Sequence, residues 1–125
     1  MNFNISIFYG SVREERQGIK GAKYLEKNLL DHFQSEYLFK PSAIASYSAG
    51  PFGGVRAAVH VRAILGELGM PAISSMLPMP GIGKLFNEEL VPHNDIVEPS
   101  TNRFLDEFLW YVEALKTQRE KGTPF

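Results

Sequence analysis

Two apolar segments of this chain each end in a glycine-rich turn that leads into a stretch of helical periodicity. The first, Phe3 to Tyr9, alternates and stops at the turn Gly10 to Gly18. The second, Ser42 to Tyr47, runs into the turn Ser46 to Gly54. A buried strand followed by a glycine turn and a helix is typical of βαβ units, whose strands are parallel. The chain is therefore predicted to be an α/β domain with helices on a parallel sheet.

The remaining elements follow from the spacing of apolar residues. Helical spacing from Gln17 predicts one helix to about Ser35, and Val55 to Leu68 predicts a second, with Gly69 as its C-cap. Three further segments complete the chain: a third strand at Ala72 to Met76, a surface excursion at Pro78 to Pro99, and a final helix capped by Ser100 whose apolar stripe reaches Leu115. A length of 125 residues favours a single domain.

Composition excludes several classes of function. Thirteen basic and fourteen acidic residues give a net charge of -1, so no general electrostatic attraction to nucleic acid or an anionic membrane is expected. Cysteine is absent, which excludes disulfides and thiolate chemistry. His32, His60 and His93 lack metal-ligand spacing, and no metal is expected. With neither a signal peptide nor a membrane-spanning run apparent, a cytoplasmic location is expected.

The first glycine turn has the residues of an anion site. Gly10 lets the backbone bend after the strand, and Ser11, Gln17 and the amides of the helix start can donate hydrogen bonds to a phosphate. Arg13 and Arg16 add positive charge. The spacing fits neither the dinucleotide fingerprint nor a Walker loop. A plain chain reversal with solvated arginines is the alternative interpretation, and the second turn has the same alternative.

The two turns together resemble the NADPH-dependent FMN reductase family of flavodoxin-like proteins. The resemblance rests on four groups of residues: Tyr9-Gly10-Ser11-Val12-Arg13 with Gly18, Ser46 to Gly50 with Phe52 to Ala58, Leu65 to Pro71, and Phe104 to Tyr111. Each motif alone is weak, but together they cover almost the whole chain. The resemblance implies a flavodoxin-like three-layer sandwich. A homo-oligomer is expected on a separate ground, because a sheet of about three strands is marginal and has exposed edges.

The resemblance also implies an activity and a cofactor site. Ser11, Arg13, Gln17 and Gly18 would hold the FMN phosphate, and Ser48, Ala49 and Gly50, with Gly53, would line the flavin. The implied reaction transfers a hydride from NADPH to FMN and passes electrons to a small-molecule acceptor, a flavin or a quinone. The flavin carries the redox chemistry, so no catalytic side chain is assigned.

One departure from the family pattern falls inside the first helix. Gly18 to Glu26 looks like the opening helix of the family, whereas Lys27 to Phe33 looks like its third. About two βα units, roughly sixty residues, are missing between Glu26 and Lys27. Residues 1–125 would then form a single truncated domain of about three parallel strands, in the order 1-4-5 of the parent fold, with three main helices. Two alternatives stay open: a non-catalytic, internally deleted variant, and a simple phosphate-binding module.

Overall fold

Two parallel strands form the centre of the part of the chain that the structure describes, residues 34–125 of a computed structural model. They are β1 (Ser42–Ser48) and β2 (Ala72–Pro80), and α3 (Val55–Glu67) connects them. The other elements are the short helix α2 (Gln34–Tyr37), the 3-10 turn η1 (Ile82–Lys84) and the long helix α4 (Val97–Lys121). Residues Ser35–Phe125 form one compact unit.

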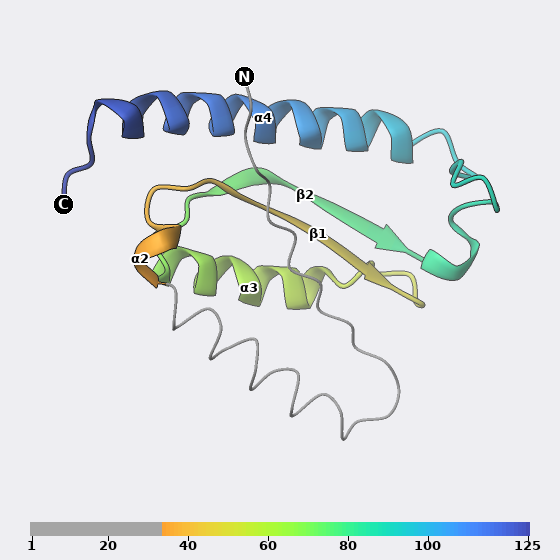
Figure 1. The fold of residues 1–125 in the computed structure, drawn as a ribbon. Coiled ribbons are helices and arrows are strands. Elements are labelled where there is room, and N and C mark those ends of the chain that lie inside the picture. The colour runs from red at the N-terminus through yellow and green to blue at the C-terminus, as the bar shows by residue number, and fades with distance from the viewer. Residues whose placement is uncertain (1–33) are drawn as a thin grey trace. The chain divides into compact units, whose positions relative to one another are not determined.

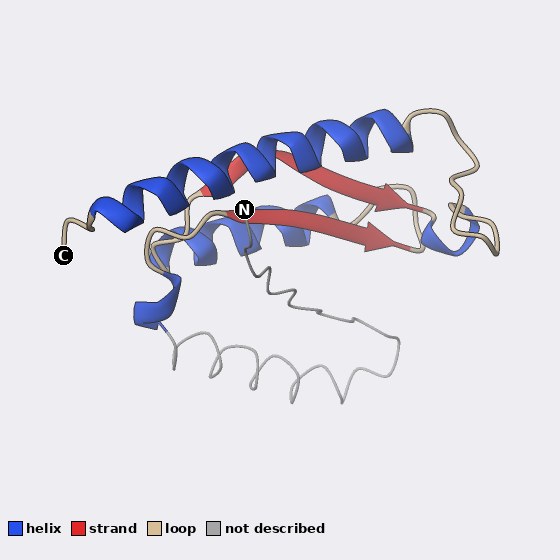
Figure 2. Ribbon diagram, turned by 45° about the horizontal axis from the view of Figure 1, so that its top comes forward, coloured by secondary structure: helices blue, strands red, loops and turns tan. Residues whose placement is uncertain are grey.

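This unit has three layers. In Figure 1, α3 lies on one face of the β1–β2 pair and α4 runs along the other. Figure 2 shows the same arrangement turned, with α4 extending along the whole length of the strands. The buried apolar residues come from every layer, and Ile73 of β2 is the most enclosed, at 1% exposure. They are Ile44, Ala58, Leu68, Ile73, Leu85 and Phe104.

The α/β architecture predicted from the sequence is confirmed, and it is that of a reduced flavodoxin-like fold. The strand expected from Ser42 and the helix expected from Val55 begin at those residues. Two parallel strands must be joined by a crossover connection. A helix between two short apolar segments therefore indicates a parallel pair of strands. The strand expected at Phe3 to Tyr9 and most of the first predicted helix lie outside the described residues. No described helix is long and apolar enough to cross a bilayer.

The second described strand is longer than predicted. The expected strand ended at Met76, and the surface excursion was expected to begin at Pro78, but β2 continues to Pro80. Its last residues stay in register with β1, with Ser46 opposite Pro78 and Ser48 opposite Pro80. Proline is tolerated where its missing N–H is not needed by a neighbouring strand. The prolines therefore did not end the strand, and the excursion begins only after it.

The final helix begins earlier than predicted. Ser100 was expected to cap it, but α4 starts at Val97. The side-chain oxygen of Asn94 accepts hydrogen bonds from the amides of Ile96 and Val97, both at 3.1 Å. Pro99 then falls in the first helical turn, where a missing N–H costs nothing. Asn94, and not Ser100, therefore accepts the hydrogen bonds at the start of this helix, and Pro99 is compatible with that start.

The C-cap of α3 lies one residue before Gly69, the predicted C-cap. Leu68 is the C-cap, and Gly69 has a left-handed φ of 71°. The amide of Met70 bonds to the Leu65 carbonyl at 2.9 Å and that of Gly69 to Gly66 at 3.0 Å, which is the Schellman arrangement. The Gly69 carbonyl in turn accepts the amide of Phe39 at 3.0 Å. The end of this helix thus anchors the segment that enters β1.

Phe39, at the entry to β1, is itself held in a left-handed conformation, with φ 61°. Such a conformation costs a non-glycine residue about 1–2 kcal/mol. Besides the bond to Gly69, its carbonyl accepts a 2.7 Å hydrogen bond from the Arg119 guanidinium. The rings of Phe39 and Phe125 lie 5.2 Å apart, centroid to centroid. These three contacts offset the cost, and those made by Arg119 and Phe125 tie the carboxyl-terminal part of the chain to the start of β1.

A bulge near the start of β2 joins α4 to the sheet. Ser42 and Ile44 of β1 pair with Ala72 and Met76 of β2, so β2 carries two extra residues there. The amides of Ser74 and Ser75 donate to the Glu107 carboxylate of α4, at 2.9 and 3.2 Å. The hydroxyl of Ser74 adds a 2.6 Å bond, and that of Ser75 adds a fourth bond. The hydroxyls of Ser74 and then Ser75 chiefly lower the pKa of Glu107 from 4.5 to about 2.

This lowered pKa predicts an acid-sensitive attachment of α4. A carboxyl with a depressed pKa in the folded state contributes stability that is complete above about pH 4.5 and is lost as the pH falls toward 2. Glu107→Gln should therefore destabilise the protein near neutrality, and the difference in free energy of unfolding from the wild type should shrink on acidification. Urea unfolding between about pH 7 and about pH 2.5 measures this difference.

Glu113→Gln is the matched control, because Glu113 is an exposed glutamate of the same helix. Its difference from the wild type should be small and show no comparable decline. A Glu107→Gln difference that stays constant across this pH range would contradict the assignment.

Candidate functional site

The glycine-rich turn that follows β1 lies at the carboxyl ends of both strands. It connects Ser48, the last residue of β1, to Val55, the first residue of α3. Because β1 and β2 are parallel, the segment after Pro80 of β2 emerges at the same edge of the sheet. In open α/β sheets this edge is where ligands bind. The turn and the Gly81–Gly83 segment therefore form the candidate site.

Two successive glycines shape the turn. Gly53 and Gly54 have φ of 59° and 75°, in the left-handed region that favours glycine. A Cβ on Gly53 would lie 2.9 Å from Cβ of Pro78, and one on Gly54 would lie 2.9 Å from the carbonyl oxygen of Tyr47. The backbone therefore passes directly against both strands. Only a residue without a side chain permits this approach.

The carbonyl of Gly50 joins the two segments of the site. It accepts a 2.8 Å hydrogen bond from the Ser48 hydroxyl within the turn. It also accepts a 3.0 Å hydrogen bond from the amide of Gly81, at the end of β2. Gly81 has a left-handed φ of 60° and precedes η1. The two carboxyl-end loops are thus fixed to one another through one oxygen atom.

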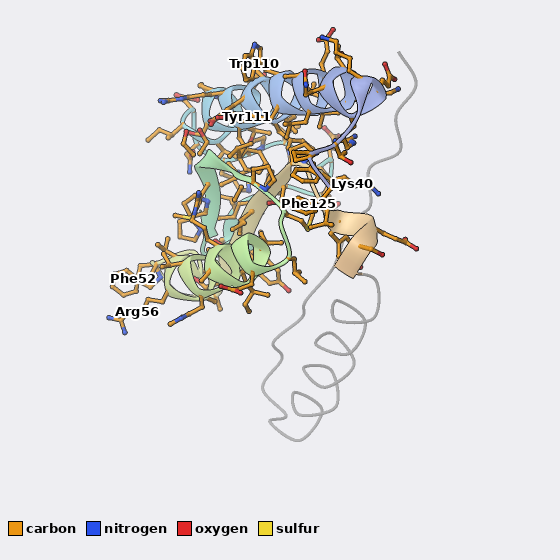
Figure 3. All side chains as sticks on the ribbon, turned by 90° about the vertical axis from the view of Figure 1, so that its left-hand side faces the viewer. Lys40, Phe52, Arg56, Trp110, Tyr111 and Phe125 are labelled. Carbon is orange, nitrogen blue, oxygen red and sulfur yellow. The ribbon has the colours of Figure 1, made fainter. Side chains whose placement is uncertain are left out.

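The outer part of the turn presents small residues to solvent. Ala49 and Gly50 are exposed, and a Cβ on Gly50 would meet no atom within 4 Å. The backbone is therefore open to a flat ligand on this side. In β1, the Ser46 hydroxyl oxygen is buried and has no hydrogen-bond partner among residues 34–125. Farther along, Phe52 is 81% exposed, and Figure 3 shows it projecting with Arg56 from the same end of α3.

The structure locates only part of the site expected from the sequence. Ser48, Ala49 and Gly50 share one exposed turn, as a common role requires, whereas Gly53 is buried against β2. Gly53 thus sets the path of the turn. The four residues expected at the phosphate, Ser11, Arg13, Gln17 and Gly18, lie outside the described residues. Their position relative to Ser48–Gly50 stays a prediction.

Sequence reasoning missed the contribution of the second loop. Gly81 and Gly83 were included in a featureless excursion, although glycines directly after a strand were the signal already used for the other turns. The polar residues of that excursion give no competing site. Within residues 34–125, no group of three or more acidic or histidine side chains is placed to hold a metal ion.

The glycine geometry predicts different results for two substitutions in one turn. Gly54→Ala should destabilise the protein by about 1–3 kcal/mol, because alanine there is strained and its Cβ meets backbone. Gly50→Ala should change stability by no more than about 0.5 kcal/mol, since its Cβ points into open space. Chemical denaturation of both variants measures this. Equal losses would show that the turn does not have this backbone path.

Comparison with known proteins gives one finding for this region. The family model of the NADPH-dependent FMN reductases matches residues 25–82, which contain β1, the glycine-rich turn, α3 and β2. No curated protein and no solved structure matches the chain. The match begins at residue 25, close to Lys27, where the sequence first resembles the third helix of the family. Over residues 25–82, the chain is similar to the NADPH-dependent FMN reductase family.

Proposed function

We propose that this protein is a flavoprotein oxidoreductase that takes a hydride from NADPH onto FMN and delivers electrons to a flavin or a quinone-like acceptor. The observation that carries the proposal is the position of the family-matched turn. Ser48, Ala49 and Gly50 lie at the carboxyl edge of a parallel sheet, inside the segment that matches the FMN reductases. This is the edge where a nucleotide cofactor binds in such folds.

The described residues fit the flat part of a flavin. Ala49 and Gly50 expose backbone with no bulky side chain, and the space around Gly50 is open. Peptide groups at such a position can hydrogen-bond the polar edge of an isoalloxazine ring, while the small side chains permit contact with its plane. Bound FMN would supply the redox chemistry as the acceptor of a hydride.

The residues of the chain have the tasks of binding and orientation. The bonds of Ser48 and Gly81 to the Gly50 carbonyl hold the turn in place before a ligand arrives. A site that needs no rearrangement loses less conformational entropy on binding. Ser11, Arg13, Gln17 and Gly18 would neutralise and bond the phosphate, as the family resemblance implies.

A second candidate function is supported by the extent of the family match. Because the match begins at residue 25, the first glycine turn falls outside it. A chain with only the second turn in family form could fold without holding FMN, as a non-catalytic variant. A phosphate-binding module that uses the first turn alone is the remaining alternative, and it would bind anions without flavin.

One experiment distinguishes these functions. The full chain is incubated with FMN and desalted, and its visible spectrum and rate of NADPH oxidation are recorded. The proposal expects a retained flavin band and NADPH oxidation with a quinone or free flavin as acceptor. A band without turnover supports binding only, and the absence of a band with a folded protein overturns the proposal.

A substitution at Gly50 tests the location of the flavin. Gly50→Ala should leave stability nearly unchanged but weaken FMN binding about tenfold or more, because the added methyl would occupy the open space next to the ring. Fluorescence quenching of FMN measures the dissociation constant. Gly66→Ala is the control, since a Cβ there also meets no atom within 4 Å and Gly66 lies near the end of α3 that is away from the turn. Equal affinity of Gly50→Ala and the wild type would place the flavin elsewhere.

We also propose that the protein is a homo-oligomer and acts in the cytoplasm. Large apolar side chains are exposed on both helical layers, among them Ile64 of α3 and Leu105, Leu109 and Trp110 of α4. Such surface is commonly covered by a second subunit. Figure 3 shows Trp110 on the outer side of α4. The lack of cysteine is compatible with a reducing compartment.

Light scattering tests the oligomeric state. At micromolar concentration the chain should have at least twice the mass of 14.0 kDa. Trp110→Glu should reduce the measured mass if α4 forms the interface, because a buried carboxylate is costly. A wild-type monomer would contradict the oligomer.

A further inference from the structure

The Glu107 carboxylate accepts hydrogen bonds from four donors, and all four belong to Ser74 and Ser75 of β2. The amide and hydroxyl of Ser74 both donate to one carboxylate oxygen, at 2.9 and 2.6 Å. The amide and hydroxyl of Ser75 both donate to the other oxygen. Each serine thus serves one oxygen with two donors. This arrangement matches a planar group with two oxygens, which is the form of a carboxylate.

The bulge, and not α4, creates this arrangement. The extra residues between Ala72 and Met76 release the amides of Ser74 and Ser75 from pairing with β1. Successive free amides on one side of a chain form a concave anion-binding surface. The carbonyl of Ser74 is held from the other layer by the Arg62 guanidinium of α3, at 3.3 Å. The donors are therefore positioned by the sheet and α3.

We propose that Ser74 and Ser75 form a carboxylate-binding site on β2, which is occupied by Glu107 and can take a small free carboxylate once that side chain is removed. The size of that carboxylate follows from the side chain. Glu107→Ala removes one methylene and the carboxylate, and these are the atoms of acetate. Acetate restores the lost group, formate leaves a gap, and propionate meets the retained Cβ. A phosphate has the wrong shape, because its oxygens are tetrahedral.

Thermal unfolding of Glu107→Ala tests the site. In sodium acetate, compared with sodium chloride of equal ionic strength at neutral pH, its Tm should rise saturably. The rise should be roughly 5 °C at about ten times the dissociation constant. Formate and propionate should give smaller rises. The wild type and Glu113→Ala should show no such rise, because their sites are filled by Glu107.

A double variant assigns the effect to the serines. Glu107→Ala with Ser75→Ala should lose most of the response to acetate, since one oxygen would keep a single donor. In nuclear magnetic resonance spectra of Glu107→Ala, the amides of Ser74 and Ser75 should shift downfield on titration with acetate. An equal response to acetate and chloride, or an undiminished response of the double variant, overturns the proposal.

A folding defect in Glu107→Ala would not leave the site untested. In that case the variant is refolded with acetate or with chloride, and its helical circular dichroism is compared with that of the wild type. Recovery in acetate alone is the expected result. Equal failure in both salts overturns the proposal, because a site formed by the sheet and α3 should accept acetate during refolding.

Discussion

The bulge in β2 connects the three layers, because side chains of both α3 and α4 form hydrogen bonds with it. Its Ile73 side chain is buried in the core, while Ser74 and Ser75 have no pairing partner in β1. Arg62 reaches the Ser74 carbonyl from α3, and Glu107 binds the neighbouring amides from α4. Backbone N–H and C=O groups that do not pair with a neighbouring strand need other hydrogen-bond partners. The irregularity in the sheet is thus satisfied by the two helices, and each helix gains a fixed position from it.

At the opposite end of the sheet, glycines determine the path of the backbone. Gly53 and Gly54 bring the turn against both strands, and Gly50 connects it to the loop after β2. The result is a hydrogen-bonded backbone surface with little side-chain bulk, inside the segment that matches the FMN reductases. The bulge attaches α3 and α4 to the sheet, whereas the glycine turn forms the exposed carboxyl edge of the sheet.

Much of this fold could be predicted from local signals. The short segment Ser42 to Tyr47, which leads into a glycine turn, and the helical spacing from Val55 identified β1 and α3, and Gly69 marked the end of that helix to within one residue. The extension of β2 to Pro80 could not be inferred, because it depends on pairing with residues of β1 that lie 32 positions earlier in the chain. The bulge has no sequence signature, and so the role of Glu107 was also missed.

For the site, sequence reasoning grouped Ser48, Ala49 and Gly50, which are the last residue of β1 and the two that follow it, and their role at a flavin stays a prediction. It could not associate Gly81 with them, because that contact is a single backbone hydrogen bond between segments far apart in the chain. Family resemblance supplied what spacing could not, namely the kind of cofactor. Residues beyond the described part of the chain carry the other half of that resemblance.

The bond between Arg119 and Phe39 has a consequence for the order of assembly. These residues are 80 positions apart, whereas β1, α3 and β2 are consecutive along the chain. Loop-closure entropy makes contacts between distant segments slow to form, and synthesis delivers the carboxyl end last. The β1–α3–β2 unit should therefore form first and wait for α4. Until Arg119 leaves the ribosome, Phe39 lacks one of the contacts that hold it in its strained conformation, and the entry to β1 stays free to relax.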